Sequence, residues 1–282
     1  MFRVVTYNVE GYQEETTPGR FAKSSESKAK VRESLRVIQP DVLALQEMGS
    51  TDALLELRES LKTEGLDLPY WEFIAGAETN IHLAILSRFP FSARRPHTND
   101  CYLLSGRRLR VGRGFCEVEV QVSPRYSFTL LAAHLKSKRA IPQADEAEMR
   151  LEEARLLREI IDARLAADPE ANLIVLGDFN DTWASASTKA VIGKGKLKLI
   201  DTRPAERNGD NSPSGTSRES RNVTWTHYYP KDDTYSRIDF ILLSRGMGRE
   251  WKANASYVLA LPNWGLASDH RPLVATFEAE DK

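Results

Sequence analysis

The sequence has few cysteines, no long apolar run and no clear excess of charge, and each of these absences excludes a class of protein. The two cysteines, Cys101 and Cys116, cannot form a disulfide framework and do not have the spacing of a zinc site. No apolar run approaches the ~18 residues needed to cross a bilayer. Residues 1–7 lead directly into a strand, without the charged leader and apolar stretch of a secretory signal. We therefore expect no transmembrane segment and a cytoplasmic protein, or a secreted one if a signal peptide has been trimmed.

The charge balance limits where attraction for a substrate can arise. Lys and Arg number 39 and Asp and Glu number 40, which gives a formal net charge of −1. The chain as a whole therefore attracts neither nucleic acid nor membrane, and any attraction must come from local patches. The 282 residues, 41% of them hydrophobic, can bury a sizeable core. Because no Pro- or Ser-rich linker divides them, we expect a single domain over residues 1–282. We also expect the protein to be a monomer.

Short apolar runs bounded by polar or turn residues predict β-strands. They lie at residues 2–7, 41–45, 81–87, 114–122, 126–133, 172–177, 223–229, 237–243 and 271–277. Stretches rich in helix formers predict helices at residues 23–39, 51–64 and 143–167, and the segment 203–221, rich in Pro, Gly and Asn, predicts a loop. Adjacent strand pairs with helices between some of them favour a β-sandwich with outer helices over a doubly wound sheet.

A set of carboxylate, amide and imidazole side chains recurs along the chain, and most of them stand where an apolar run ends. They are Asn8, Glu47, His134, Asp178, Asn180, Asp239, Asp269 and His270. Buried strands place their ends along one edge of a sheet, so residues scattered over the chain can meet in one cleft. Together these groups are what metal-assisted attack on a phosphate ester requires.

Two of these residues suit a hard cation. Glu47 follows the run VLALQ and is the obvious carboxylate for Mg²⁺, which prefers oxygen ligands. The alternative is a glutamate at the N-terminus of the following helix. Asn8, in TYNVEG, offers its amide to the metal or to a phosphate oxygen. The alternative for Asn8 is an asparagine that tolerates the turn before Gly11.

The motifs GDFND and SDHRP supply the remaining chemistry. After the tight turn that Gly177 allows, Asp178 and Asn180 point to one side because they are two residues apart. An ionised Asp178 can orient or deprotonate water and Asn180 can hold a phosphate oxygen, although an Asx turn explains the same pattern. His270 is expected to face the substrate, with Asp239 holding it in one tautomer or protonated.

This ordered set of residues resembles the endonuclease/exonuclease/phosphatase superfamily of Mg²⁺-dependent phosphoesterases, over nearly the whole chain. The resemblance implies an α/β fold of four layers, in which two packed mixed β-sheets are flanked by helices. It implies Mg²⁺ as cofactor, and we expect Mn²⁺ to substitute because both ions accept oxygen-rich octahedral sites. The implied roles are metal binding by Glu47, Asn8 and Asp269, water activation by Asp178, phosphate contact by Asn180 and His270, and orientation of His270 by Asp239.

His134 narrows the resemblance. In having a histidine at this place, the sequence resembles pancreatic-type deoxyribonucleases, sphingomyelinases and tyrosyl-DNA phosphodiesterases. The resemblance implies that His134 contacts the phosphate. The stretch HLKSKR resembles tyrosyl-DNA phosphodiesterases and secreted bacterial nucleases. The segments GDFNDTW and YSRIDF depart from the pattern of inositol polyphosphate 5-phosphatases. The long hydrophobic hairpin of secreted sphingomyelinases is not evident either.

Two basic clusters bear on the substrate. The first contains Arg107, Arg108, Arg110 and Arg113, and the second, which follows the strand that ends at His134, contains Lys136, Lys138 and Arg139. Such clusters can neutralise the phosphates beside a scissile bond, although a solvated hairpin is the plainer interpretation. We take Arg107, Arg108, Lys136 and Ser137 as candidates for substrate contact.

We predict a Mg²⁺-dependent phosphodiesterase whose phosphodiester substrate is nucleic acid. Aromatic residues near the predicted site could stack on a base or simply pack; they are Trp183, Trp225, Tyr228, Tyr229 and Trp264. The alternatives of the same fold are a phosphomonoesterase and a lipid-headgroup phosphodiesterase. A binding protein without turnover is a further alternative, against which the complete set of acids and imidazoles argues.

Overall fold

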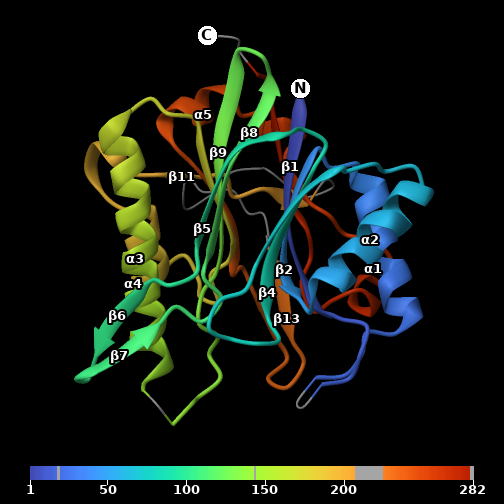
Figure 1. The fold of residues 1–282 in the computed structure, drawn as a ribbon, viewed down its shortest axis with the longest axis horizontal. Coiled ribbons are helices and arrows are strands. Elements are labelled where there is room, and N and C mark those ends of the chain that lie inside the picture. The colour runs from blue at the N-terminus through green and yellow to red at the C-terminus, as the bar shows by residue number, and fades with distance from the viewer. Residues whose placement is uncertain (18–19, 143, 207–224, 280–282) are drawn as a thin grey trace, which may run out of the picture.

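Two large mixed sheets pack face to face at the centre of the molecule, and helices lie on their outer faces (Figure 1). The structure is a computed structural model and describes residues 1–282 except 18–19, 143, 207–224 and 280–282. The expected four-layer α/β sandwich is confirmed. In the described part of the chain, no helix is both long and apolar enough to cross a lipid bilayer.

The first sheet has seven strands in the order β12–β16–β17–β1–β2–β4–β3. In that order their bounds are Ala205–Glu206, Tyr257–Val258, Leu273–Phe277, Phe2–Tyr12, Val42–Met48, His82–Ser87 and Tyr70–Ile74. β1 pairs parallel with β2 and antiparallel with β17. The carboxyl ends of β1 and β2 therefore lie at one edge of the sheet, where Asn8 is opposite Gln46, the residue before Glu47.

The second sheet has six strands in the order β11–β15–β10–β9–β8–β5. In that order their bounds are Ile200–Asp201, Asp239–Leu243, Leu173–Asp178, Tyr126–His134, Phe115–Ser123 and Phe91–His97. β10 pairs parallel with β9 and antiparallel with β15, so Asp178 is opposite both His134 and Asp239. Two hairpins form small separate sheets: β6 (Cys101–Leu104) with β7 (Arg107–Arg110), and β13 (His227–Tyr229) with β14 (Thr234–Ser236).

Helices cover the outer face of each sheet. Around the first sheet lie α1 (Ser25–Ile38) and α2 (Thr51–Thr63); around the second lie α3 (Glu146–Ala167) and α4 (Ala186–Ile192) (Figure 1). The remaining helical segments are α5 (Arg245–Glu250) and 3₁₀ turns at Gly195–Leu197, Ala253–Ala255 and Trp264–Leu266. A further apolar cluster, drawn from both sheets, fills the space between them.

The helices begin where the sequence supplies capping side chains. The Asp145 carboxylate accepts hydrogen bonds from the backbone N–H groups of Ala147 and Glu148 at the start of α3. Along α3, the apolar residues Leu157, Ile161 and Leu165 are buried against the second sheet, as their spacing of four predicts. Burial of this stripe fixes the helix against β9 and β10, the strands that carry two of the predicted site residues.

Gly177 allows β10 to approach β9 closely just before Asp178. Its φ of +134° is a conformation that residues with a side chain rarely adopt, and a Cβ atom there would lie 1.9 Å from the carbonyl oxygen of Ala133. Any side chain at this position would therefore push the two strands apart at the residues that end them, Asp178 and His134.

The long elements predicted from the sequence correspond to observed ones, whereas strands at the edges of the sheets were not predicted. The strands at β3 and β5 and the helix α4 were not predicted, whereas the β6–β7 hairpin agrees with the solvated hairpin given above as the plainer interpretation of the first arginine cluster. The predicted strand at 223–229 is observed as β13 at its end, and its residues 223–224 lie outside the described chain. In the predicted loop 203–221, residues 205–206 pair as β12, and residues 207–221 lie outside the described chain.

Candidate active site

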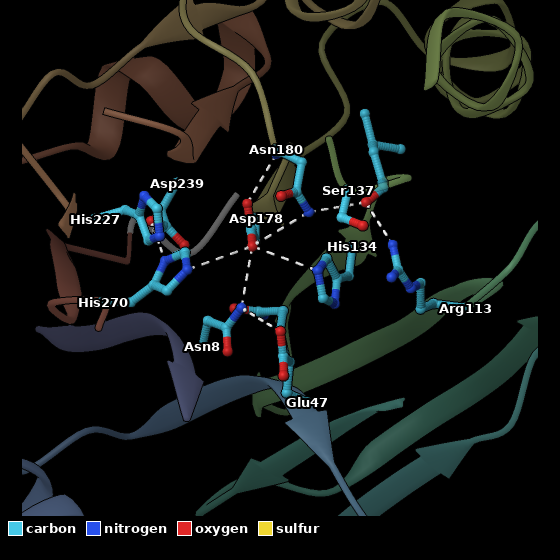
Figure 2. A network of polar contacts seen from close by, with 12 residues as sticks. Asn8, Glu47, Arg113, His134, Ser137, Asp178, Asn180, His227, Asp239 and His270 are labelled. Carbon is cyan, nitrogen blue, oxygen red and sulfur yellow. Dashed lines mark hydrogen bonds and ion pairs between the residues drawn. The ribbon is translucent and has the colours of Figure 1, made fainter. Parts of the chain in front are cut away.

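Asp178 is the centre of a cluster of polar groups at the carboxyl ends of β1, β9 and β10 (Figure 2). Its Oδ2 atom lies 3.0 Å from Asn8 Nδ2, 3.4 Å from His134 Nε2, 3.5 Å from Asn180 Nδ2 and 3.7 Å from His270 Nε2. Asp178 itself is 1% exposed. The structure thus brings together groups from both sheets on one buried carboxylate oxygen, although they are up to 262 residues apart in sequence.

The GDFND segment forms the Asx turn that its sequence allowed and also presents its side chains to the site. The backbone N–H of Asn180 donates to Asp178 Oδ1 at 2.8 Å, and Asn180 adopts a φ of 53°. Its Nδ2 donates to the backbone oxygen of Leu135 at 3.0 Å. The local turn and the functional arrangement are therefore the same structure, because the turn orients the Asn180 amide toward Asp178.

Asp239 holds His270 from behind. The two side chains are buried, and His270 Nδ1 lies 2.8 Å from Asp239 Oδ2, which also accepts a hydrogen bond from Thr226 Oγ1 at 2.6 Å. The Ser268 hydroxyl accepts from the backbone N–H of His270 at 3.0 Å and donates to the backbone oxygen of Asn8 at 2.7 Å. These contacts fix the ring with Nε2 directed toward Asp178.

The two imidazoles of the site differ in protonation at neutral pH. Burial disfavours the cationic form of His270, but the carboxylates of Asp239 and Asp178 more than offset this and raise its pKa to about 10. Burial and the nearby Arg113 guanidinium instead lower the pKa of His134 well below its usual value. Burial raises the pKa of Asp178, which is also next to the Asp239 carboxylate. The site therefore offers one imidazolium, His270, and one neutral imidazole, His134.

Glu47 is held as a carboxylate at the end of β2. Burial alone would raise its pKa, yet the surrounding His134 and Arg20 groups lower it below its usual value. Because His134 is neutral at pH 7, we attribute this stabilisation to Arg20, whose Nη1 lies 2.8 Å from Glu47 Oε2. The other carboxylate oxygen, Oε1, accepts a hydrogen bond from Asn8 Nδ2 at 3.3 Å.

The oxygen donors here fit a hard divalent cation. Glu47 is ionised and pairs with Arg20, and Asn8 lies directly beside it. Asn8 presents its Nδ2 to Glu47, while its Oδ1, the atom that can bind a cation, accepts a hydrogen bond from the backbone N–H of Glu10 at 3.0 Å. Asp269 keeps a partly exposed carboxylate, and its backbone N–H donates to Glu10 Oε2 at 3.1 Å. Glu10 is close enough to both Glu47 and Asp269 for the two charges to raise its pKa, after the larger effect of burial. The predicted ligands thus share one acidic neighbourhood.

Two other groups of potential ligand atoms lie within 4.8 Å of one another: His227 with Asp269 and His270, and Asp178 with Asp239 and His270. Both depend on His270, whose Nδ1 is bound to Asp239. Mg²⁺ and Mn²⁺ prefer oxygen ligands to imidazole. We therefore regard the oxygen set around Glu47 as the better candidate for a metal centre.

The predicted substrate-contact residues lie in different surroundings. Arg107 and Arg108 are exposed on β7. Lys136 is buried, and its Nζ donates to the backbone oxygens of Ser137 and Arg139 at 3.1 and 3.0 Å and to Ser137 Oγ at 3.3 Å. Its charge orders the turn after His134, so contact with a substrate would require these bonds to change.

Arg113 does not share the surroundings of the other arginines in its cluster. It is 3% exposed, and its Nη1 donates to the backbone oxygen of Leu135 at 2.7 Å (Figure 2). Arg237 pairs with Asp201 rather than with Asp239.

Sequence reasoning missed the roles of Arg20, Thr226 and His227, because no local pattern connects these residues with their partners.

The comparisons with known proteins place this arrangement in a family. Residues 5–270 match the model of the Endonuclease/Exonuclease/phosphatase family. The chain belongs to this family and has the fold of its phosphoesterases. A search among curated proteins finds no match.

Solved structures agree with the family assignment. A 3′ phosphatase, NExo, from Neisseria bound to product DNA hairpin has a TM-score of 0.64 and 18% identity, covering 99% of this chain and 100% of its own. Truncated TDP2 from Caenorhabditis elegans has a TM-score of 0.63 and 17% identity, covering 99% and 97%. Sphingomyelinase C from Streptomyces griseocarneus has a TM-score of 0.62 and 16% identity, covering 98% and 99%. At these identities, the likeness establishes the fold alone.

Proposed function

We propose that this protein is a divalent-metal-dependent phosphodiesterase that hydrolyses nucleic acid. The observation that carries the proposal is the convergence of Asn8, His134, Asn180 and His270 on one oxygen of the buried Asp178. A carboxylate so placed can orient a water molecule and accept its proton, while the amide and imidazole N–H groups around it donate to phosphate oxygens. In-line attack on phosphorus requires these two functions side by side.

Each residue has a distinct task in this proposal. The cationic His270 donates from Nε2 and offsets charge that develops on the phosphate, while Asp239 keeps it protonated. The neutral His134 donates a hydrogen bond without competing for the proton that Asp178 accepts. The raised pKa of Asp178 makes it a stronger base than an exposed aspartate, which favours proton transfer from water near neutral pH.

Glu47, Asn8 and Asp269 would hold the metal. A bound divalent cation supplies positive charge that neutralises the phosphate and stabilises the leaving oxygen. The ionised state of Glu47, kept by Arg20 even at low pH, prepares this side chain for a cation.

Nucleic acid is the favoured substrate on two grounds. The Neisseria structure of the same fold carries product DNA, and the exposed Arg107 and Arg108 on β7 can neutralise backbone phosphates. A lipid-headgroup phosphodiester is the second candidate substrate, because a sphingomyelinase has the same fold. A phosphomonoester is the third, because the Neisseria protein is named a phosphatase.

A turnover assay separates these possibilities. Hydrolysis of bis-p-nitrophenyl phosphate with Mg²⁺, abolished by chelator and restored by Mg²⁺ or Mn²⁺, is expected of the wild type and not of Asp178→Asn. A panel of single- and double-stranded DNA, RNA, tyrosyl-ended DNA, a phosphomonoester and phospholipid vesicles then identifies the substrate. Absence of all turnover by a folded, metal-loaded protein would indicate a binding protein and overturn the proposal.

A further inference from the structure

A column of three aromatic rings leads from the candidate active site to the surface. The ring of His227 on β13 lies 4.5 Å from the ring of His270, centroid to centroid, at an interplanar angle of 45°. The ring of Tyr229 lies 6.3 Å beyond it at 25°, in an offset stack. Tyr229 is 41% exposed, so part of its ring is open to solvent. The column therefore begins at the imidazolium proposed to bind the phosphate and ends at an accessible aromatic surface.

The β13–β14 hairpin is docked rigidly beside His270. The backbone N–H of Tyr228 donates to the backbone oxygen of Asp269 at 2.9 Å, and that of Arg271 donates to the backbone oxygen of Thr226 at 2.7 Å. His227 Nε2 also lies 3.6 Å from Asp269 Oδ2. These contacts hold the hairpin at both sides of His270, so the backbone that carries Tyr229 is anchored beside the site.

The two faces of the hairpin differ. Alternation along β13 places His227 and Tyr229 on one face and Tyr228 on the other, where its register partner is Tyr235. The opposite face is internally packed: the Tyr235 ring lies 4.6 Å from Tyr228 and 4.9 Å from Trp225, measured between ring centroids. Only the face that carries His227 and Tyr229 is continuous with the active site.

We propose that Tyr229 is a specificity-determining residue on which a nucleobase adjacent to the scissile phosphate stacks. This inference rests on the proposed function and deepens it, because it makes a planar base, and not only a phosphodiester, part of what is recognised. Only the ring of His227 separates His270 from Tyr229 in this column, so a nucleotide attached to a phosphate at His270 would lie beside it. Base–aromatic stacking tolerates any base, so Tyr229 selects for the presence of a base and not for its identity.

The test compares two oligomers of equal length and charge, an oligothymidylate and an oligomer of abasic tetrahydrofuran phosphodiesters. We expect the wild type to have a lower KM for the oligothymidylate. Tyr229→Leu should raise that KM by about 5- to 140-fold, as expected from loss of one stack, and leave kcat and the KM for the abasic oligomer unchanged. Tyr229→Phe should behave as wild type, because it keeps the ring.

Tyr235→Leu is the matched control, since it removes an exposed tyrosine from the same hairpin but from the opposite face. We expect the KM of this variant to be unchanged and the thermal melts of both leucine variants to match the wild type. These results would assign the higher KM of Tyr229→Leu to loss of stacking. Equal KM values of the wild type for both oligomers, or an unchanged KM in Tyr229→Leu, would overturn the inference while nucleic-acid cleavage stands. Turnover of bis-p-nitrophenyl phosphate without cleavage of either oligomer would overturn the proposed nucleic-acid function and the inference together.

Discussion

The charge on His270 depends on its Asp239 partner, and this dependence can be measured. The pKa of His270 is raised to about 10 by Asp239 and Asp178 despite burial, whereas an unfolded histidine titrates near ~6.5. The stabilisation of the folded state from this proton is therefore complete below pH ~6.5 and is lost as the pH rises through about 10. An NMR titration is expected to find the His270 ring cationic at pH 8. A ring that is neutral at pH 7 would contradict the assignment.

Asp239→Asn tests the same pair by function. The amide cannot stabilise the imidazolium, so the pKa of His270 should fall and turnover should fall by about 10²–10⁴, with a smaller change in KM. Thr226→Val removes the other donor to Asp239 Oδ2 without removing the charge, and should have a smaller effect. Equal loss of turnover in the two variants would indicate that Asp239 acts structurally.

Glu47 is the residue on which metal binding should depend. Glu47→Gln keeps the shape of the side chain and removes the charge, so calorimetry is expected to find Mg²⁺ binding abolished or greatly weakened, with the circular dichroism spectrum unchanged. Glu59→Gln, on the exposed face of α2, is the control and should bind Mg²⁺ as the wild type does. Wild-type affinity in Glu47→Gln would remove this residue from the metal centre.

At the scale of elements, sequence patterns identified the buried strands and the capped helices more readily than the sheet edges. β2 and β10 are buried throughout nearly their whole length and read as unbroken apolar runs. β5 is an edge strand in which burial alternates and which contains Pro96, so its sequence FSARRPH has no such run. The edge strand β3 was missed for a related reason, since most of its residues are only partly buried.

The β9–β10 contact should be intolerant of any side chain at position 177. Gly177→Ala places a Cβ atom in the space of the Ala133 carbonyl and forces an unfavourable φ, so we expect a loss of stability of about 3 kcal/mol or more. Differential scanning calorimetry measures it. Gly265→Ala, where a Cβ atom would have no neighbour within 4 Å, should change stability by no more than about 0.5 kcal/mol. Comparable melting temperatures for the two variants would refute this explanation.

The β6–β7 hairpin is the element through which salt should act on substrate binding. If Arg107 and Arg108 contact backbone phosphates, Arg107→Ala/Arg108→Ala should flatten the log–log dependence of affinity on salt by about 1.8 for duplex DNA or about 1.4 for single strands. The control is Arg245→Ala/Arg249→Ala on α5, whose arginines pair with Glu170. An unchanged slope in the hairpin variant would favour a small or lipid phosphoester.

At the scale of the whole molecule, the sequence predicted which residues meet but not how they are connected. Polar residues after apolar runs indicated Asn8, Glu47 and Asp178, because strand ends share an edge, and the SDH motif indicated His270. The contacts of Thr226 with Asp239 and of Arg113 with the Leu135 carbonyl arise from tertiary packing alone, so no spacing in the sequence could reveal them. The roles of individual site residues remain predictions that the variants above test.

The hydrogen bond between Asn8 and Asp178 joins the two sheets, since β1 belongs to the first and β10 to the second. The relative position of the two sheets therefore sets the distance between Asn8 and Asp178, and the site is intact only while the sheets stay aligned. A small slip between the sheets would leave the secondary structure intact and separate Asp178, the proposed base, from Asn8 and Glu47, the proposed metal ligands. We therefore expect turnover in rising urea to disappear at a lower concentration than the far-ultraviolet circular dichroism signal. Coincident transitions would mean that the sheets separate only when the molecule unfolds.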